Sequence, residues 1–124
     1  MRLIKFRGKV ARGSKLNEWM FVEFGTDAIQ CGFDYNEPYF NNSPVIRNTI
    51  GQYTGLKDKN GVEIYEWDIL EFEHGGKCKA YVAYRDGAFD VKNEHQDVLL
   101  YLSVVSEKSK VIGNIFDDPE LIDS

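Results

Sequence analysis

Carboxylates are concentrated near the middle of the chain, within residues 63–73, where the sequence reads EIYEWDILEFE. Hard cations such as Mg²⁺ bind clustered carboxylate oxygens, and a bound Mg²⁺ could serve a metal-dependent hydrolase. A β-strand, however, would spread these side chains over both of its faces, and no basic residue for holding a phosphate lies among them. We therefore favour a solvated acidic face, and a metal-dependent hydrolase at residues 63–73 is the second alternative function. The acidic residues are Glu63, Glu66, Asp68, Glu71 and Glu73.

A second group of possible metal ligands is the pair His74 and Cys78, which lie four residues apart and close to the same carboxylates. Imidazole, thiolate and carboxylate could hold a transition metal together. Gly75 and Gly76 lie between the two residues and indicate a hairpin turn, which would leave the ligand geometry uncontrolled. We predict an exposed histidine and a packed cysteine, with no metal site and no other cofactor.

Residues for nucleophilic catalysis are not arranged in a recognisable pattern. His95 has no neighbouring combination of serine, cysteine and aspartate typical of a triad, and the chain has no glycine-rich phosphate loop. We therefore expect no catalytic residues and no enzyme activity.

The feature with the clearest binding potential is a basic row formed by Lys5, Arg7 and Lys9, which alternate along a predicted strand and so share one face. With the aromatic residues Trp19 and Tyr53, this row could bind nucleic acid. It could instead pair with the acidic C-terminal residues, within one chain or between subunits. Solubilising charge and protection of a strand edge is the simpler interpretation, which we favour. Those C-terminal acids are Asp117, Asp118, Glu120 and Asp123.

The charge of the chain is unevenly distributed along its 124 residues. The net charge is −5, yet the first 15 residues carry six basic and no acidic side chains, and the rest carries nine basic and 20 acidic ones, a net −11. An acidic body repels polyphosphates over most of its surface, which disfavours sequence-independent nucleic-acid binding. We therefore favour a protein over a nucleic acid as the binding partner, and a homo-oligomer is plausible.

The elements that must position these residues are mostly strands, because short alternating runs are cut by turn residues about every ten positions. Asn60-Gly61 predicts a tight hairpin with positive φ angles. Residues 32–44 are rich in turn residues and predict a long surface loop, in which Tyr35, Tyr39 and Phe40 fold back over the core. Strands are expected at residues 4–10, 19–24, 50–54, 62–65, 68–73, 77–84, 88–92, 98–105 and 110–116, and a short helix at 117–122.

The cellular location follows from what the sequence contains. No run approaches the roughly 20 apolar residues needed to cross a bilayer, and charges interrupt the N-terminal segment where a secretory signal would be apolar. Cys31 and Cys78 are too few for a disulfide framework. We expect two reduced thiols, no membrane partner and a cytoplasmic protein.

Three blocks of sequence carry a resemblance to a known family: residues 4–9 read IKFRGK, 51–70 read GQYTGLKDKNGVEIYEWDIL, and 111–121 read VIGNIFDDPEL. Their order and spacing resemble the YopX family of phage and prophage proteins. The resemblance implies a mostly β fold, a phage or prophage origin in a bacterial host cell, and no established activity. The family pattern runs Tyr-Glu-Gly-Asp-Ile where this chain has Trp67, and we predict a negative φ at Trp67.

The sequence thus predicts a single domain over residues 1–124, in which N-terminal strands (1–50) pack with a barrel-like meander (51–116). The fold class is mostly β, with antiparallel strands forming a small SH3-like or related barrel and a short C-terminal helix. The expected function is that of a phage- or prophage-encoded β module for protein interaction or self-assembly. Nucleic-acid binding through the basic N-terminal strand is the alternative.

Overall fold

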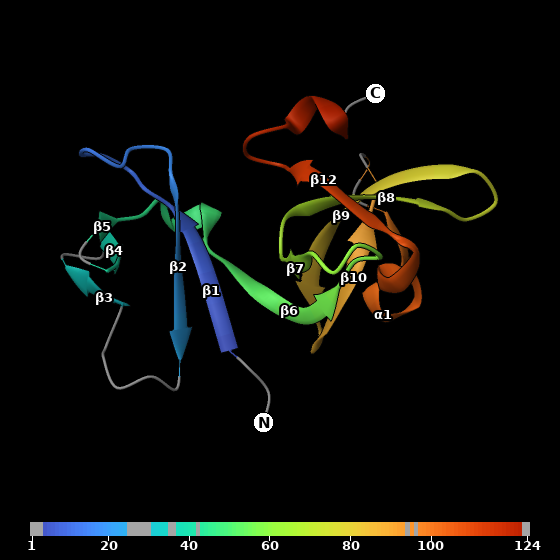
Figure 1. The fold of residues 1–124 in the computed structure, drawn as a ribbon, viewed down its shortest axis with the longest axis horizontal. Coiled ribbons are helices and arrows are strands. Elements are labelled where there is room, and N and C mark those ends of the chain that lie inside the picture. The colour runs from blue at the N-terminus through green and yellow to red at the C-terminus, as the bar shows by residue number, and fades with distance from the viewer. Residues whose placement is uncertain are drawn as a thin grey trace. The chain divides into compact units, whose positions relative to one another are not determined.

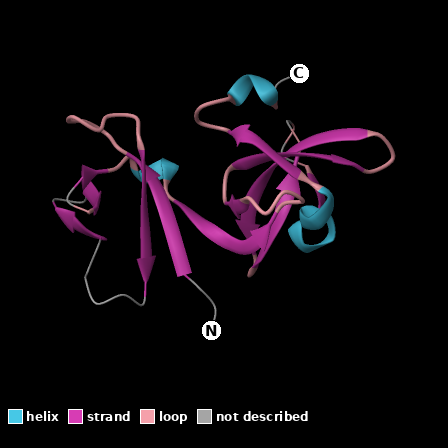
Figure 2. Cartoon of the chain, in the orientation of Figure 1, coloured by secondary structure: helices cyan, strands magenta, loops and turns pink. Residues whose placement is uncertain are grey.

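The computed structural model describes residues 4–24, 31–34, 37–41, 43–93, 95 and 97–122, without the side chains of residues 24 and 31–34. Strands dominate these residues and every strand pairing is antiparallel, which confirms the mostly β fold (Figure 2). The chain divides into two compact units, Met1–Tyr53 and Thr54–Ser124. We call them unit 1 and unit 2 and describe each by itself.

Unit 1 is built around β1 (Ile4–Lys9), which lies between β2 (Trp19–Phe24) and the start of β6 (Gly51–Lys57) (Figure 1). The register aligns Lys9 with Trp19 and Phe6 with Gln52. Phe6 and Met20 pack against a buried cluster of Val22, Phe40 and Val45, so the apolar face of β1 and β2 points to the core as the alternation predicts. β6 continues into unit 2 and pairs there with β7 (Glu63–Tyr65).

The prediction of a surface loop at residues 32–44 is wrong. This segment forms a three-stranded sheet of β3 (Cys31–Asp34), β4 (Glu37–Phe40) and β5 (Ser43–Pro44). The turn-forming residues separate short strands here, and Asn41 connects β4 to β5 with a φ of 50°, which asparagine tolerates better than most residues. Phe40 is buried in the core, as predicted, and Tyr39 is half-buried. Tyr35 lies outside the described residues.

Unit 2 contains a five-stranded sheet in the order β11-β10-β9-β8-β12. β8 to β11 pair consecutively, and β12 returns to lie beside β8. One face of the sheet covers a core that includes Ile64, Leu70, Val82 and Val91. The strands are β8 (Asp68–Glu73), β9 (Lys77–Arg85), β10 (Ala88–Lys92), β11 (Val98–Tyr101) and β12 (Lys110–Asn114).

The prediction of one strand over residues 98–105 is only half correct. The strand ends at Tyr101, and α1 (Leu102–Val105) follows, succeeded by the 3-10 turn η2 (Ser106–Lys108). Leu102 and Val105 are both fully buried in the core of unit 2. Residues three apart share a face of a helix but alternate across a strand, so burial of this pair favours the helical turn.

The C-terminal helix is reduced to one 3-10 turn, η3 (Pro119–Leu121). Pro119 occupies its first turn, where a missing N–H is tolerated. Asp118 occupies the N-cap position, but its side chain makes no capping hydrogen bond. Its carboxylate instead accepts the backbone N–H of Asn114 at 3.3 Å, which fixes the turn that follows β12.

The hairpin between β6 and β7 is confirmed, but its turn differs from the one predicted. Gly61 has a φ of 80°, whereas Asn60 keeps a negative φ. The Gly61 N–H donates to the carbonyl oxygen of Asp58 at 3.0 Å, and the Asp58 N–H donates to that of Val62 at 2.9 Å. The loop is therefore one residue wider than a two-residue turn, with glycine alone supplying the left-handed backbone.

A closed barrel is not formed by the described strands, whose three sheets have open strand orders. The SH3-like barrel and the packing of the chain into one domain therefore stay predictions. Among the described residues, no helix is both long and apolar enough to cross a membrane.

Candidate functional site

The structure brings the five predicted binding residues onto one face of the unit 1 sheet, opposite its apolar core. Lys5, Arg7 and Lys9 follow one another along β1, with Trp19 beside Lys9 on β2 and Tyr53 on β6. We call this surface the cation–ring face. Its residues come from three strands, so the register of β1 with both neighbours positions them.

Each cation on this face lies over an aromatic ring. Arg7 Cζ is 4.7 Å from the ring centroid of Trp19, and Lys9 Nζ is 6.0 Å from it. Lys5 Nζ lies 4.8 Å from the ring centroid of Tyr53. The ring quadrupole attracts a cation at these distances, which holds the long side chains against the sheet. The contacts give the predicted basic row a structural role in unit 1. Binding of a ligand by this row stays a prediction.

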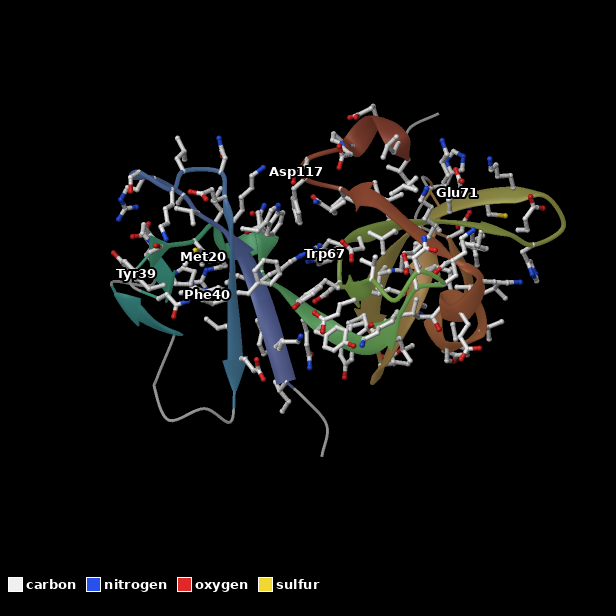
Figure 3. The ribbon with its side chains drawn as sticks, in the orientation of Figure 1. Met20, Tyr39, Phe40, Trp67, Glu71 and Asp117 are labelled. Carbon is white, nitrogen blue, oxygen red and sulfur yellow. The ribbon has the colours of Figure 1, made fainter. Side chains whose placement is uncertain are left out.

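The acidic run in unit 2 is dispersed. Asp68 is buried, and its Oδ2 accepts the backbone N–H of Tyr65 at 2.7 Å. Glu71 is labelled in Figure 3, and its Oε1 lies 3.7 Å from Lys77 Nζ. Glu73 is exposed at the end of β8. The described part of the chain contains no group of three or more His, Cys, Asp or Glu side chains placed to hold a metal ion. The metal-dependent hydrolase stays an untested prediction.

His74 and Cys78 flank the turn between β8 and β9, as the sequence indicates. His74 is exposed and its backbone N–H donates to Gly76 O at 2.8 Å. Cys78 Sγ lies 3.7 Å from His74 O and 3.6 Å from Gly76 O, and the side chain packs against the core of unit 2. An exposed histidine and a packed cysteine are confirmed. The side chain of Cys31 lies outside what the structure describes.

The prediction of a negative φ at Trp67 is wrong, because its φ is 77°. The backbone on both sides of this residue is fixed: its N–H donates to Val82 O at 2.8 Å, and its carbonyl oxygen accepts the Ile115 N–H at 3.0 Å. The indole lies edge-on to the ring of Phe116, with 6.3 Å between centroids. The turn therefore imposes the conformation of a glycine, and Trp67 adopts it at a cost of about 1–2 kcal/mol.

Asp58 is a structural site that the sequence analysis missed. Its Oδ1 accepts the backbone N–H groups of Asn60 and Val62 at 2.8 and 2.9 Å, and its Oδ2 accepts that of Val111 at 2.9 Å. Burial opposes ionisation of this carboxyl, but the three hydrogen bonds outweigh it and lower its pKa below the ordinary value. An aspartate two residues before Asn-Gly is the signal of such a turn.

Unit 2 also has an exposed apolar strip, which the sequence analysis did not identify. It runs along the edge strand β11 and into α1, and we call it the β11 strip. A run of four consecutive apolar residues, 98–101, could have indicated it, because one face of a strand buries only every second residue. Its members and their exposed fractions are Val98 (46%), Leu99 (39%), Tyr101 (63%) and Val104 (56%).

Next to this strip lies a cavity of about 290 Å³ in unit 2. Asp90 of β10 reaches it and is only 5% exposed. Asp90 is aligned with Tyr101 of β11 on one side and with Ala83 of β9 on the other. Its Oδ1 accepts no hydrogen bond from any described residue. The remaining lining residues are Arg85, Asp86, Ala88 and Val98.

The fold is thus mostly β, and comparison with known proteins places the chain in a family. The YopX protein family matches residues 5–123, so the chain belongs to the YopX family. The structure is similar to the crystal structure of protein EF1440 from Enterococcus faecalis, with a TM-score of 0.59 and 27% sequence identity. That similarity covers 97% of this chain and 98% of EF1440. No match is found among curated proteins.

Proposed function

We propose that this chain is a phage- or prophage-encoded interaction module that binds a partner protein through the β11 strip and performs no catalysis. The observation that carries the proposal is the exposure of Val98, Tyr101 and Val104 on adjoining elements of unit 2. Exposed apolar side chains on adjoining elements are costly in water, and in soluble proteins patches of such side chains mark interaction sites. We place its action in the cytoplasm of a bacterial host.

The mode of binding follows from the geometry of β11. It is an edge strand, but it has only four residues, and the register shift after Val91 leaves Leu99 as an extra residue in a bulge. Short, bulged edges discourage the addition of another strand. Side chains, with the aromatic ring of Tyr101 at the centre of the strip, therefore carry the contact with the partner.

Affinity capture from induced host cells tests this proposal with three baits: the wild type, the double variant Val98→Ser/Val104→Ser, and Val62→Ser. Val62 is exposed to a similar extent at the β6–β7 hairpin, so Val62→Ser controls for a general loss of surface hydrophobicity. We expect a partner that binds the wild type and Val62→Ser but not the double variant. A set of captured proteins identical for all three baits would contradict the proposal.

Self-association is the form of this proposal in which the partner is a second copy. Light scattering over a wide range of concentrations measures it directly. A rise in mass that Val98→Ser/Val104→Ser abolishes would assign the strip to a homo-oligomer. A strict monomer at high concentration would restrict the proposal to a different protein.

Nucleic-acid binding is the second candidate function, favoured by the cation–ring face of unit 1. Single strands are bound through phosphate contacts with cations and stacking on exposed rings. On this face the half-buried ring of Trp19 is the one available for stacking, because Tyr53 is only 7% exposed. The candidate predicts an affinity that falls steeply with salt and after replacement of Lys5, Arg7 and Lys9 by glutamine. A flat gel-shift titration at low salt would exclude it.

A further inference from the structure

Asp90 lies in an energetically demanding position on the sheet of unit 2. Its carboxylate is 95% buried between two strands, on the face of the sheet that carries Ala83 and Tyr101. A buried carboxylate is stable only when hydrogen bonds or an opposite charge compensate its lost hydration. Among the described residues, nothing donates to Oδ1, so this oxygen lacks such compensation.

The ionisable groups near Asp90 are a phenol, a second carboxylate and one guanidinium. Tyr81 has a raised pKa, caused first by burial of its phenol and then by the charge of Asp90. Asp86 also lines the cavity, and Arg85 is the single cation among the described lining residues. The Arg85 guanidinium is turned toward Asp86, with Nε 3.5 Å from Oδ2, so the cavity retains a net negative charge at Asp90.

The size and walls of the cavity limit what can enter. Its volume of about 290 Å³ falls at the lower end of the roughly 300–1,000 Å³ typical of small-molecule sites, which suits one side chain. Tyr101 offers an exposed ring beside Asp90, and Val98 supplies an apolar wall for the methylene groups of a long side chain. A guanidinium combines donors for a carboxylate with a planar surface that stacks on aromatic rings.

We propose that this cavity is a specificity pocket that receives an arginine side chain of the partner protein, with Asp90 Oδ1 as acceptor and the ring of Tyr101 as stacking surface. The inference rests on the proposed function, since the pocket opens beside the β11 strip that binds the partner. It defines the partner chemistry as a segment in which an arginine is flanked by apolar residues.

The pocket can be tested without knowing the partner. The probe is N-acetyl-arginine amide, and its neutral counterpart N-acetyl-citrulline amide has nearly the same shape without the charge. Titration of the isotope-labelled full chain, followed by NMR, should give saturable shift changes at the backbone amides of Ala88, Asp90 and Tyr101 with the arginine probe. The citrulline probe should give much smaller changes at the same amides.

Three variants identify the residues responsible. Asp90→Asn preserves shape and should weaken the arginine probe about tenfold or more, because a charged hydrogen bond is lost. Glu107→Gln, which alters an exposed carboxylate that does not line the cavity, should leave binding within about twofold of the wild type. Tyr101→Leu should weaken binding without changing the preference over citrulline. The spectrum outside the pocket reports whether each variant remains folded.

Several results would overturn the inference: equal shifts with both probes, unchanged binding by Asp90→Asn, or no shifts in the folded wild type. Binding that appears only in Arg85→Ala would also overturn it, because the pocket would then be occupied by Arg85 of the same chain. These outcomes are separable from the proposed function, which is tested by the strip variants. Loss of arginine binding in Asp90→Asn with partner capture unchanged would reject the pocket while retaining the strip.

Discussion

The carboxylate of Asp58 is bonded to the backbone N–H of Val111, 53 residues further along the chain, with 2.9 Å between Oδ2 and nitrogen. The same side chain closes the β6–β7 hairpin through its other oxygen. One buried carboxylate therefore joins the hairpin at the start of unit 2 to β12 at its end. The block of sequence that carries the family resemblance around Asn60-Gly61 thus has a structural reason for its composition.

Asp58→Ala should lower the free energy of unfolding by roughly 3 kcal/mol, because three backbone N–H groups lose their acceptor in a site closed to water. Asp58→Asn keeps one acceptor oxygen and should lower the free energy of unfolding by less than Asp58→Ala does. Urea unfolding monitored by fluorescence measures both variants. Asp86→Asn is the control, since Asp86 is exposed, and should change the free energy by less than about 0.5 kcal/mol. An equally mild effect of Asp58→Ala would contradict the anchoring role.

Acid should remove the stabilisation that Asp58 provides. Its pKa in the folded chain is lower than the ordinary value of 3.8, so the contribution is fully present above about pH 5. It declines as the pH falls through about 4 toward the lower folded pKa, because the unfolded chain then takes up a proton that the hydrogen-bonded carboxylate of the folded chain does not. The difference in unfolding free energy between wild type and Asp58→Asn should shrink over this range. A difference that is constant from pH 6 to pH 2 would contradict it.

At position 67, glycine should give a more stable folded chain than alanine. Trp67→Ala loses the contact with Phe116 but retains the positive φ, whereas Trp67→Gly also loses the contact but removes the backbone strain. Trp67→Gly should therefore be more stable than Trp67→Ala by about 1 kcal/mol. At Tyr84, in the extended strand β9, the order should reverse, because glycine weakens a strand relative to alanine. The same order at both positions would show that Trp67 is not strained.

Gly8 should be sensitive to the addition of a single methyl group. A Cβ at this position would lie 3.1 Å from Phe40 Cε2 and 3.2 Å from Val45 Cβ, closer than ordinary packing. Gly8→Ala should destabilise the chain by about 1–3 kcal/mol through overpacking. Phe40→Leu removes the nearest atom, so the cost of Gly8→Ala should be smaller in that background. Strictly additive free energies in this double-mutant cycle would contradict the packing described for unit 1.

Alternation of polar and apolar residues was sufficient to predict much of the fold. It placed Lys5, Arg7 and Lys9 on one face of β1 and located the meander of unit 2. It failed for residues 32–44, because turn residues between very short strands were interpreted as a loop. It also failed at Leu102 and Val105, where a local pattern compatible with a strand is overruled by burial of both side chains in the core of unit 2.

The candidate sites depended more on register than on pattern. The sequence named Trp19 and Tyr53 as possible partners of the basic row, but only the pairing of β1 with β2 and β6 brings them to one face. Asp90 could not be identified in advance. Its burial depends on neighbours from β9 and β11, and an isolated aspartate in a strand gives no sign of this. The prediction of a negative φ at Trp67 failed because hydrogen bonds to distant carbonyl and N–H groups fix this turn, rather than the residue itself.

Site-specific photo-crosslinking tests most directly whether the β11 strip is the binding surface. A benzophenone amino acid replaces Tyr101 in one sample and Val62 in a matched control, and both chains are irradiated in host cells. A discrete crosslinked product should form at position 101, disappear when Val98→Ser/Val104→Ser is added, and be absent at position 62. Crosslinking at position 62 alone, or a product at position 101 that survives the double variant, would contradict the assignment of this surface.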